Sequence, residues 1–279
     1  MLDTTTDLAS LLKDPSLLET RAYVGGRWVD GDEGTFAVTN PARGDVIADV
    51  ADLSRAQVAE AITAAETAQK DWASWTGKAR GAVLRKWFNL MLETAQDMGL
   101  LLTAEQGKPL AEAVGEIGYG ASFIEFFAEE AKRVYGETIP GHLRNARIQV
   151  WKQPIGVAAS ITPWNFPNAM ITRKAGPALA AGCAIDARPA EDTPLSAIAL
   201  GVLAERAGIP AGVLSIVPSS NASEIGKEFC ENPTVRKLTF TGSTEVGRIL
   251  LRQAADQVMK CSMELGGNAP FIVFDDADL

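Results

Sequence analysis

The stretches GVAASI at residues 156–161 and CAIDA at 183–187 begin a series of short apolar segments that continues with GVLSIV at 212–217 and RKLTF at 236–240. Their length and apolar character predict buried strands. Helical patterns separate them along the chain. Strands that alternate with helices predict an α/β protein with a parallel sheet, whose ligands bind at the carboxyl ends of the strands.

The residues before this series predict packed helices, two strands and one interruption. Helical spacing of apolar side chains indicates helices at 8–18 (broken by Pro15), from Ser54 as N-cap to about 68, and at 83–91, 98–106 and 110–134. Residues 23–29 and 36–38 predict strands joined by a polar, glycine-rich turn. After a turn at 139–141, residues 147–152 alternate apolar and polar side chains, which predicts a half-exposed strand.

The composition excludes several classes of protein. The 279 residues include 26 Lys and Arg against 35 Asp and Glu, a net charge of −9, and 47% are hydrophobic, as in one large or two ordinary globular domains. An acidic chain without basic clusters is not expected to bind nucleic acid or an anionic membrane, and the longest apolar stretch is too short to cross a bilayer. The start of the chain has no secretory pattern, and its three cysteines are too scattered for disulfides or a metal site. We therefore expect a cytoplasmic protein without a metal centre.

The end of the sequence leaves two alternatives open. Residues 269–274 predict an apolar strand, and the sequence stops at Leu279 without a covering helix. Either this strand pairs at the edge of a sheet, or the chain is cut inside a domain.

A glycine turn follows the last strand of the series. LTFTGSTEVG at 238–247 leads from a strand through Gly242 into a helix, so free backbone N–H groups and the positive helix end would face an anion such as a pyrophosphate. The spacing is GxTxxG and not GxGxxG. An ordinary turn with Ser243 as N-cap therefore explains the motif about as well.

Two more motifs place polar side chains where ligands bind. In TPWNFP at 162–167, Asn165 directly follows a strand and is able to donate its amide to an oxyanion. In ELGG at 264–267, between a helix ending near Met259 and the next strand, a partly buried Glu264 is able to act as a general base. The alternatives, an ordinary strand-to-helix loop and a surface Glu beside a flexible turn, are commoner for either motif alone.

Taken together the motifs are far more specific, and over residues 11–279 the chain resembles the aldehyde dehydrogenase superfamily, most closely its succinate-semialdehyde dehydrogenase branch. The segments that carry the resemblance are EQGKPLAEA (105–113), AKRVYGETIP (131–140), TPWNFP (162–167), MITRKAGPALAAGC (170–183), FTGSTEVG (240–247) and ELGGNAPFIVFDDADL (264–279).

The resemblance implies a Rossmann-like NAD-binding domain with N-terminal helices and a β-hairpin arm for oligomerisation, and a catalytic domain that is essentially absent. It divides the chain into four parts: the N-terminal part of the NAD-binding domain (1–136), the oligomerisation hairpin (137–153), the NAD-binding core (154–264) and the start of a truncated catalytic domain (265–279).

In that family a cysteine thiolate attacks an aldehyde, hydride passes to a nicotinamide, and a glutamate activates the water that hydrolyses the thioester. Carried over by motif, Asn165 is the oxyanion donor and Glu264 the general base. The resemblance assigns dinucleotide binding to Ile161, Thr162, Pro163, Trp164, Arg188, Glu191, Gly242, Ser243, Gly247 and Leu265, with Ser243 at the pyrophosphate.

The chain departs from the family at the nucleophile and at the ribose site. The family's cysteine follows the ELGG segment, and none of the cysteines before Leu279 matches it by motif. Where the family has Lys-Pro-Ala-Ser or Lys-Pro-Ala-Glu, this chain has Arg188-Pro-Ala-Glu191. Glu191 is expected to accept a hydrogen bond from the ribose 2′-OH and to favour NAD over NADP. The opposing interpretation is that Arg188 pairs with a 2′-phosphate.

Asp186 is a third departure, because it lies inside the strand at 183–187. An isolated carboxylate is costly in a sheet that is buried on both faces. Arg188, two residues further and so on the same face, is the predicted partner of Asp186.

We therefore expect a succinate-semialdehyde-dehydrogenase-like protein that binds NAD, with NADP as the alternative, and that lacks turnover alone, so that its status as an enzyme stays open. A small aldehyde would be a substrate only if a catalytic domain is supplied. The expected partners are further copies of the chain or a full-length relative. The alternative function is a non-catalytic dinucleotide-binding or interaction protein, a degenerate paralogue.

Overall fold

A seven-stranded sheet forms the centre of the computed structural model, which describes residues 8–278. Its five parallel strands are, in spatial order, β11 (Lys260–Glu264), β10 (Val235–Thr241), β7 (Val157–Ile161), β8 (Ala184–Arg188) and β9 (Leu214–Ile216). The antiparallel hairpin of β1 (Ala22–Val24) and β2 (Arg27–Val29) extends the sheet beyond β9. The predicted α/β class with a parallel sheet is confirmed.

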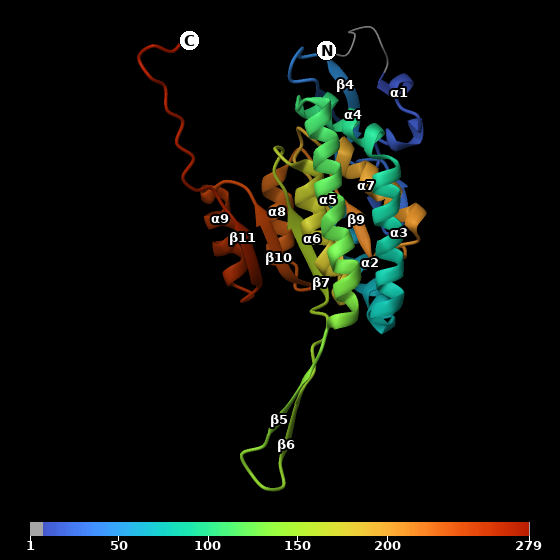
Figure 1. Cartoon of the computed structure of the whole chain (residues 1–279), viewed down its shortest axis with the longest axis vertical. Coiled ribbons are helices and arrows are strands. Elements are labelled where there is room, and N and C mark those ends of the chain that lie inside the picture. The colour runs from blue at the N-terminus through green and yellow to red at the C-terminus, as the bar shows by residue number, and fades with distance from the viewer. Residues whose placement is uncertain (1–7, 279) are drawn as a thin grey trace.

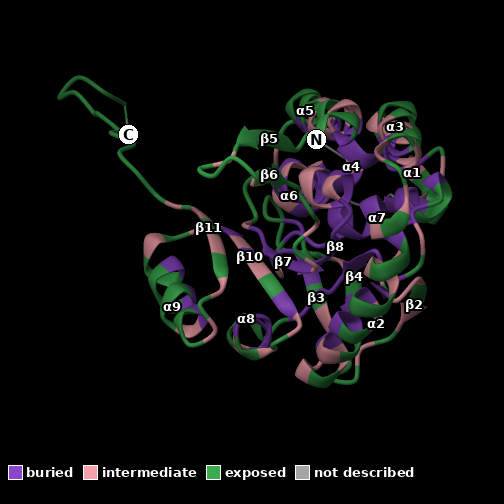
Figure 2. Ribbon diagram, turned by 90° about the horizontal axis from the view of Figure 1, so that it is seen from below, coloured by how far each residue is buried: buried purple, intermediate pink, exposed green. Residues whose placement is uncertain are grey.

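Helices cover both faces of this sheet (Figure 2). One layer contains α3 (Gly77–Glu93), α4 (Ala95–Gln106), α5 (Leu110–Glu130), α6 (Pro167–Ala181) and α7 (Leu195–Ala207), and the opposite face carries α2 (Arg55–Ser74), α8 (Ala222–Glu231) and α9 (Thr244–Ala255). Short helical turns are α1 (Leu8–Leu11), η1 (Pro15–Leu17) and η2 (Ala131–Arg133). Buried apolar side chains form one core on each side of the sheet. Within residues 8–278, no helix is both long enough and apolar enough to cross a membrane.

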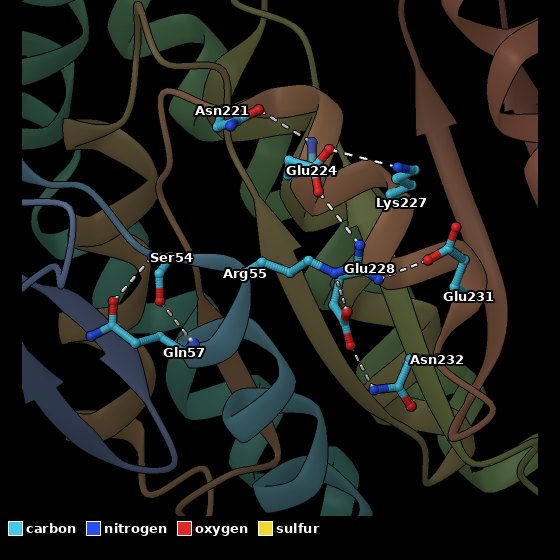
Figure 3. A network of polar contacts seen from close by, with 9 residues as sticks. All are labelled: Ser54, Arg55, Gln57, Asn221, Glu224, Lys227, Glu228, Glu231 and Asn232. Atoms are coloured by element: carbon cyan, nitrogen blue, oxygen red, sulfur yellow. Dashed lines mark hydrogen bonds and ion pairs between the residues drawn. The ribbon is translucent and has the colours of Figure 1, made fainter.

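The N-terminus of α2 shows how local sequence positions a distant helix. Ser54 is the predicted N-cap, and its hydroxyl and backbone N–H exchange hydrogen bonds with Gln57 in a capping box. The next residue, Arg55, extends to α8 and donates from Nε to Glu228 and from Nη2 to Glu231, both at 2.7 Å (Figure 3). Its Nη1 lies 3.4 Å from Glu224 on the same helix. The Arg55 guanidinium thus connects α8 to the start of α2 through hydrogen-bonded ion pairs.

A two-stranded hairpin extends away from the body of the molecule (Figure 1). It consists of β5 (Glu137–Pro140) and β6 (Arg147–Val150), with Ile139 paired with Ile148. Every residue of both strands is exposed. The strand predicted at 147–152 is therefore present, but the half-exposed burial is wrong because no sheet lies behind the hairpin.

The N-terminal strand prediction needs correction. Residues 23–29 are themselves the β1–β2 hairpin, which turns at Gly25 and Gly26, both with positive φ. They do not pair with residues 36–38. Those residues belong to β3 (Thr35–Thr39), which forms a separate antiparallel pair with β4 (Val46–Ala51).

The C-terminal strand prediction is also wrong. Residues 269–274 form no strand and extend away from β11 (Figure 1), with Phe271 92% exposed. Their apolar side chains contact no second sheet face that would stabilise a strand. The last strand is instead β11, which pairs with β10 and ends at Glu264, just before the two glycines of ELGG.

Candidate active site

The strand order creates a crevice beside β7. The chain passes from β7 to β8 on one side, whereas β10 lies on the other side of β7. Connections that diverge in this way leave room for a ligand at the carboxyl ends of the strands. A cavity of about 430 Å³ lies there, and its lining includes seven residues predicted for the site: Pro163, Trp164, Asn165, Gly242, Ser243, Glu264 and Leu265.

One wall of the cavity is the N-terminus of α9. Ser243 is exposed and is the N-cap, and its Oγ accepts a hydrogen bond from Val246 N–H at 3.2 Å. Its hydroxyl hydrogen stays available to a ligand. Gly242 N–H donates to the Glu264 carbonyl, and a Cβ on Gly242 would lie 2.5 Å from the Phe240 ring. A side chain at position 242 would force the Phe240 ring to move from its place beside this turn, which joins the ends of β10 and β11.

Gly247 permits a close approach inside the protein. A Cβ on Gly247 would lie 2.5 Å from Cδ2 of Leu265. The bare backbone of α9 therefore lets Leu265 pack on its first turns, which brings the segment after β11 against the cavity.

The other end of the crevice lies after β8. Arg188 is 4% exposed, and its Nη2 donates to Glu191 Oε2 at 2.6 Å and to the Ser219 carbonyl at 2.8 Å. The Glu191 side chain is 45% exposed and faces solvent. Ile161 and Thr162 are both buried, so they support the crevice from beneath without presenting their side chains to it.

The predicted pair of Asp186 and Arg188 is wrong. Asp186 is fully buried, and neither of its carboxylate oxygens has a hydrogen-bond partner within residues 8–278. Burial raises the pKa of Asp186 to about 7, and the nearby Ser215 hydroxyl on the neighbouring strand opposes this. Although both side chains belong to one face of β8, Arg188 lies at the strand end and turns towards Glu191 and Ser219.

Arg173 enters the site from α6, a role that the sequence did not reveal. Its Nη2 lies 3.9 Å from Glu264 Oε2, and its guanidinium stacks 5.7 Å from the centre of the Phe123 ring. The Glu264 side chain is 61% exposed and so is less buried than predicted. The cavity thus contains a carboxylate, a cation and the exposed Asn165 side by side.

Lys174, the next residue of α6, is a second group that the sequence did not reveal. It is 8% exposed, and its Nζ donates to Thr241 Oγ1 at 2.6 Å. Burial lowers the pKa of Lys174 to about 8, and the charge of Arg173 adds to this, whereas Glu264 opposes it. A signal was present, because Arg173 and Lys174 are the only charged residues in the apolar segment 170–183.

None of the three cysteines lines the cavity with Asn165 and Ser243. Cys183 lines a neighbouring cavity of about 510 Å³ that also reaches Arg173, Lys174 and Glu264, but it precedes the first residue of β8, at the amino ends of the strands. Five residues at about 3.3 Å each separate the two ends of the parallel strands. Cys230 is buried, which raises its pKa to about 12, and burial also raises the pKa of Cys261. Among the described residues, no group of three or more His, Cys, Asp and Glu side chains is arranged to hold a metal ion.

Residues 28–279 match the model of the aldehyde dehydrogenase family. The chain therefore belongs to the aldehyde dehydrogenase family. The crevice with its glycine turn at Gly242 and the carboxylate of Glu264 lies within the matched residues. Among curated relatives, the chain is 61% identical over 269 residues to a glutarate-semialdehyde dehydrogenase of Pseudomonas aeruginosa, a match that covers 96% of this chain and 56% of that protein. It is 58% identical, with the same coverage of both chains, to an NADP(+) succinate-semialdehyde dehydrogenase of Escherichia coli.

Solved structures agree with the sequence matches. An aldehyde dehydrogenase from Brucella melitensis biovar abortus 2308 superimposes with a TM-score of 0.91 at 62% identity, over 96% of this chain and 55% of that one. A betaine aldehyde dehydrogenase from Staphylococcus aureus in complex with NAD+ superimposes with a TM-score of 0.89 at 32% identity, over 97% and 54%. This chain therefore spans a little more than half the length of the relatives it matches.

Proposed function

We propose that this chain binds NAD in the crevice beside β7, and that it contributes this site to the oxidation of a semialdehyde to the corresponding acid, without turnover when it acts alone. One observation carries the proposal: the loop with Asn165, the α9 terminus with Ser243, and Glu264 line the same 430 Å³ cavity. Each group comes from a different sequence motif, and the fold brings all three to one cavity.

The residues of the crevice fit a dinucleotide. Ser243 and the N-terminus of α9 suit a pyrophosphate, because a helix N-terminus presents backbone N–H groups and positive potential. At the other end, Glu191 offers carboxylate oxygens to ribose hydroxyls, and Arg188 Nε is buried without a partner in the described part of the chain. Bound there, NAD would supply the hydride acceptor. The carboxylate of Glu191 favours NAD over a cofactor with a 2′-phosphate.

The remaining groups suit the chemistry of an aldehyde. The Asn165 amide would donate to the oxygen that becomes negative when the carbonyl is attacked. Glu264, exposed and at the end of β11, would accept a proton from water. Arg173 beside it supplies a cation for a carboxylate at the far end of the substrate, as the semialdehydes in the names of the two curated relatives carry.

Turnover by these 279 residues alone would require a cysteine nucleophile. A thiolate is needed for a covalent intermediate, and the cysteines present are buried or have raised pKa values. We expect the purified polypeptide to bind NAD and to produce no NADH from succinate or glutarate semialdehyde, measured by absorbance. Production of NADH would contradict this part of the proposal. The aldehyde would react where a catalytic domain, in the same protein or in a relative paired with this chain, supplies the thiolate.

Calorimetric titration tests the dinucleotide site. Saturable binding of NAD, weakened about tenfold or more in Ser243→Ala by loss of a hydrogen bond to a charged phosphate, is expected. Ser122→Ala, on the surface of α5, is the matched control and is expected to bind like the unchanged chain. The absence of NAD binding would instead favour the alternative, a non-catalytic interaction protein. We also propose a cytoplasmic protein that pairs through the β5–β6 hairpin.

A further inference from the structure

The loop that carries Asn165 has little structure of its own to hold it. Trp164, Asn165 and Phe166 are exposed, and none belongs to a helix or strand. The helix that follows, α6, begins at Pro167, and its N-cap Phe166 makes no side-chain capping hydrogen bond. Because helix termini leave backbone N–H groups without partners, a group from elsewhere must satisfy them.

Glu116 of α5 provides that group. Its Oε1 accepts hydrogen bonds from the backbone N–H groups of Asn168 at 3.1 Å and Ala169 at 3.2 Å, in the first turn of α6. Glu116 is 3% exposed, and its negative charge lies at the positive end of the helix. A carboxylate from a neighbouring helix thus does the work of an N-cap.

Lys108 connects this carboxylate to the loop. Its ammonium donates to Glu116 Oε2 at 2.6 Å and to the carbonyl oxygen of Asn165 at 3.0 Å. It also lies 3.8 Å from the centre of the Phe166 ring. The side chain of Lys108 is 11% exposed and that of Glu116 is 1% exposed, so the charge-assisted bond between them is shielded from water, whereas the contacts of Lys108 with Asn165 and the Phe166 ring lie at the surface.

We propose that Lys108 and Glu116 are positioning residues, which hold the backbone of the loop so that the Asn165 amide faces the cavity. The inference rests on the proposed role of Asn165 as oxyanion donor. Lysine suits the task because its ammonium has three donors and can bond the carboxylate and the carbonyl while contacting the ring. A neutral apolar side chain of similar length would fill the space and make neither bond.

A fluorine label on the loop tests this arrangement directly. In the full 279-residue chain with 5-fluorotryptophan, the ¹⁹F resonance of Trp164 is the one lost in Trp164→Phe. Lys108→Met is expected to shift or split this resonance, while the resonances of the buried Trp72 and Trp87 keep their positions. Lys108→Arg, which retains the charge and several donors, is expected to restore the original Trp164 resonance.

A surface lysine provides the matched control. Lys132 pairs with Glu129 at 2.8 Å, and Lys132→Met removes an ion pair without contact to the loop. All tryptophan resonances are expected to stay in place in that variant. A Trp164 resonance that is unchanged in Lys108→Met, or equally changed in Lys132→Met, would overturn the proposal.

Glu116→Gln keeps the proposal testable if Lys108→Met does not fold. The amide retains an acceptor for α6 but loses the charge that binds Lys108, so the same displacement of the Trp164 resonance is expected. Loss of every native resonance in both variants would also overturn the proposal, since the pair would then serve folding and not the loop. The label needs neither cofactor nor substrate, so failure of NAD binding in the unchanged chain would contradict the proposed function alone.

Discussion

Asp186 is an acid placed where an apolar side chain would suit the sheet. It is fully buried, and its pKa is raised to about 7. An unfolded Asp titrates near pH 4, so between about pH 4 and pH 7 the folded state holds a proton that the unfolded state has released. The free energy of unfolding therefore falls as pH rises through this window, and the loss is complete above pH 7.

Asp186→Val is expected to remove this dependence. The variant should be more stable than the unchanged chain by about 2–4 kcal/mol at pH 8, with most of the difference gone at pH 4. Urea unfolding at both pH values measures it. Glu105, whose pKa burial raises to about 7, titrates in both proteins and cancels in the comparison. The exposed Asp192→Val is the control, and an equal gain at both pH values in Asp186→Val would contradict the explanation.

Glu191 determines how Arg188 is used. While the 2.6 Å ion pair is intact, Arg188 has a carboxylate partner and a 2′-phosphate would meet negative charge. Glu191→Ser is expected to weaken NAD binding and strengthen NADP binding, each about tenfold, because the guanidinium then becomes available to a phosphate. Calorimetric titrations with both cofactors measure the ratio. Asp192→Ser, at the adjacent exposed position, should leave the ratio unchanged.

At the residue scale, the sequence indicated the groups that lie in recognisable turns. Asn165 and Ser243 each follow a strand and Glu264 ends one, and parallel strands place such positions at one edge of a sheet. Arg173 belongs to a helix and Lys108 to the segment between α4 and α5, and in neither place does a local pattern show which side chains reach a site. The partners of Arg188 were mistaken because two side chains on one strand face are about 7 Å apart, and each turns towards the nearest partner it can reach.

Among the elements, α8 depends on one side chain from outside it. Arg55 lies among Glu224, Glu228 and Glu231 of α8. These carboxylates are three and four residues apart along the helix, so without the Arg55 guanidinium they would repel one another. Arg55→Met is expected to speed amide hydrogen exchange in α8 about tenfold, equivalent to about 1.4 kcal/mol of local stability. Arg85→Met is the matched control, because Arg85 is similarly exposed and binds two carboxylates of α5. Unchanged exchange in α8, or equal acceleration there in Arg85→Met, would contradict the role of Arg55.

The hairpin β5–β6 exposes apolar side chains that its own strands cannot cover. Ile139 and Ile148 are paired across the hairpin and are both more than a third exposed. The double change to Ser is expected to convert oligomers to monomers in sedimentation velocity, with the melting temperature of the body unchanged. Gln149→Ser, one position along β6 and so on the other face, should leave assembly intact. A monomeric unchanged chain would contradict the prediction at once.

Helices and strands were predictable from the sequence where their formation depends on local contacts. The N-cap at Ser54 and the strands of the core were predictable from spacing and apolar character. β4 and β11 were not. The burial of β4 does not alternate along the strand, β11 has no fully buried residue, and each depends on pairing with a neighbouring strand, β3 or β10. The segment 269–274 has the composition of a strand, but a strand needs a neighbour, and composition alone does not reveal one.

For the molecule as a whole, the parallel core and its helical layers were predictable, because alternation of strands and helices permits few topologies. The position of the β1–β2 hairpin was not predictable, since nothing in its composition indicates that it joins the β9 edge of the same sheet. The division of the chain at residues 136, 153 and 264 stays a prediction.

The pairing of β1 with β9 has a consequence for folding during synthesis. β1 leaves the ribosome long before its partner in the central sheet, Ile216 of β9, which lies opposite Tyr23. Until Ile216 has been synthesised, β1 has only β2 beside it and its buried side chains lack the rest of the sheet, and closing so long a loop is slow. The nascent chain is therefore expected to bind chaperones through the β1–β2 hairpin, and to release them only after residue 216 has emerged.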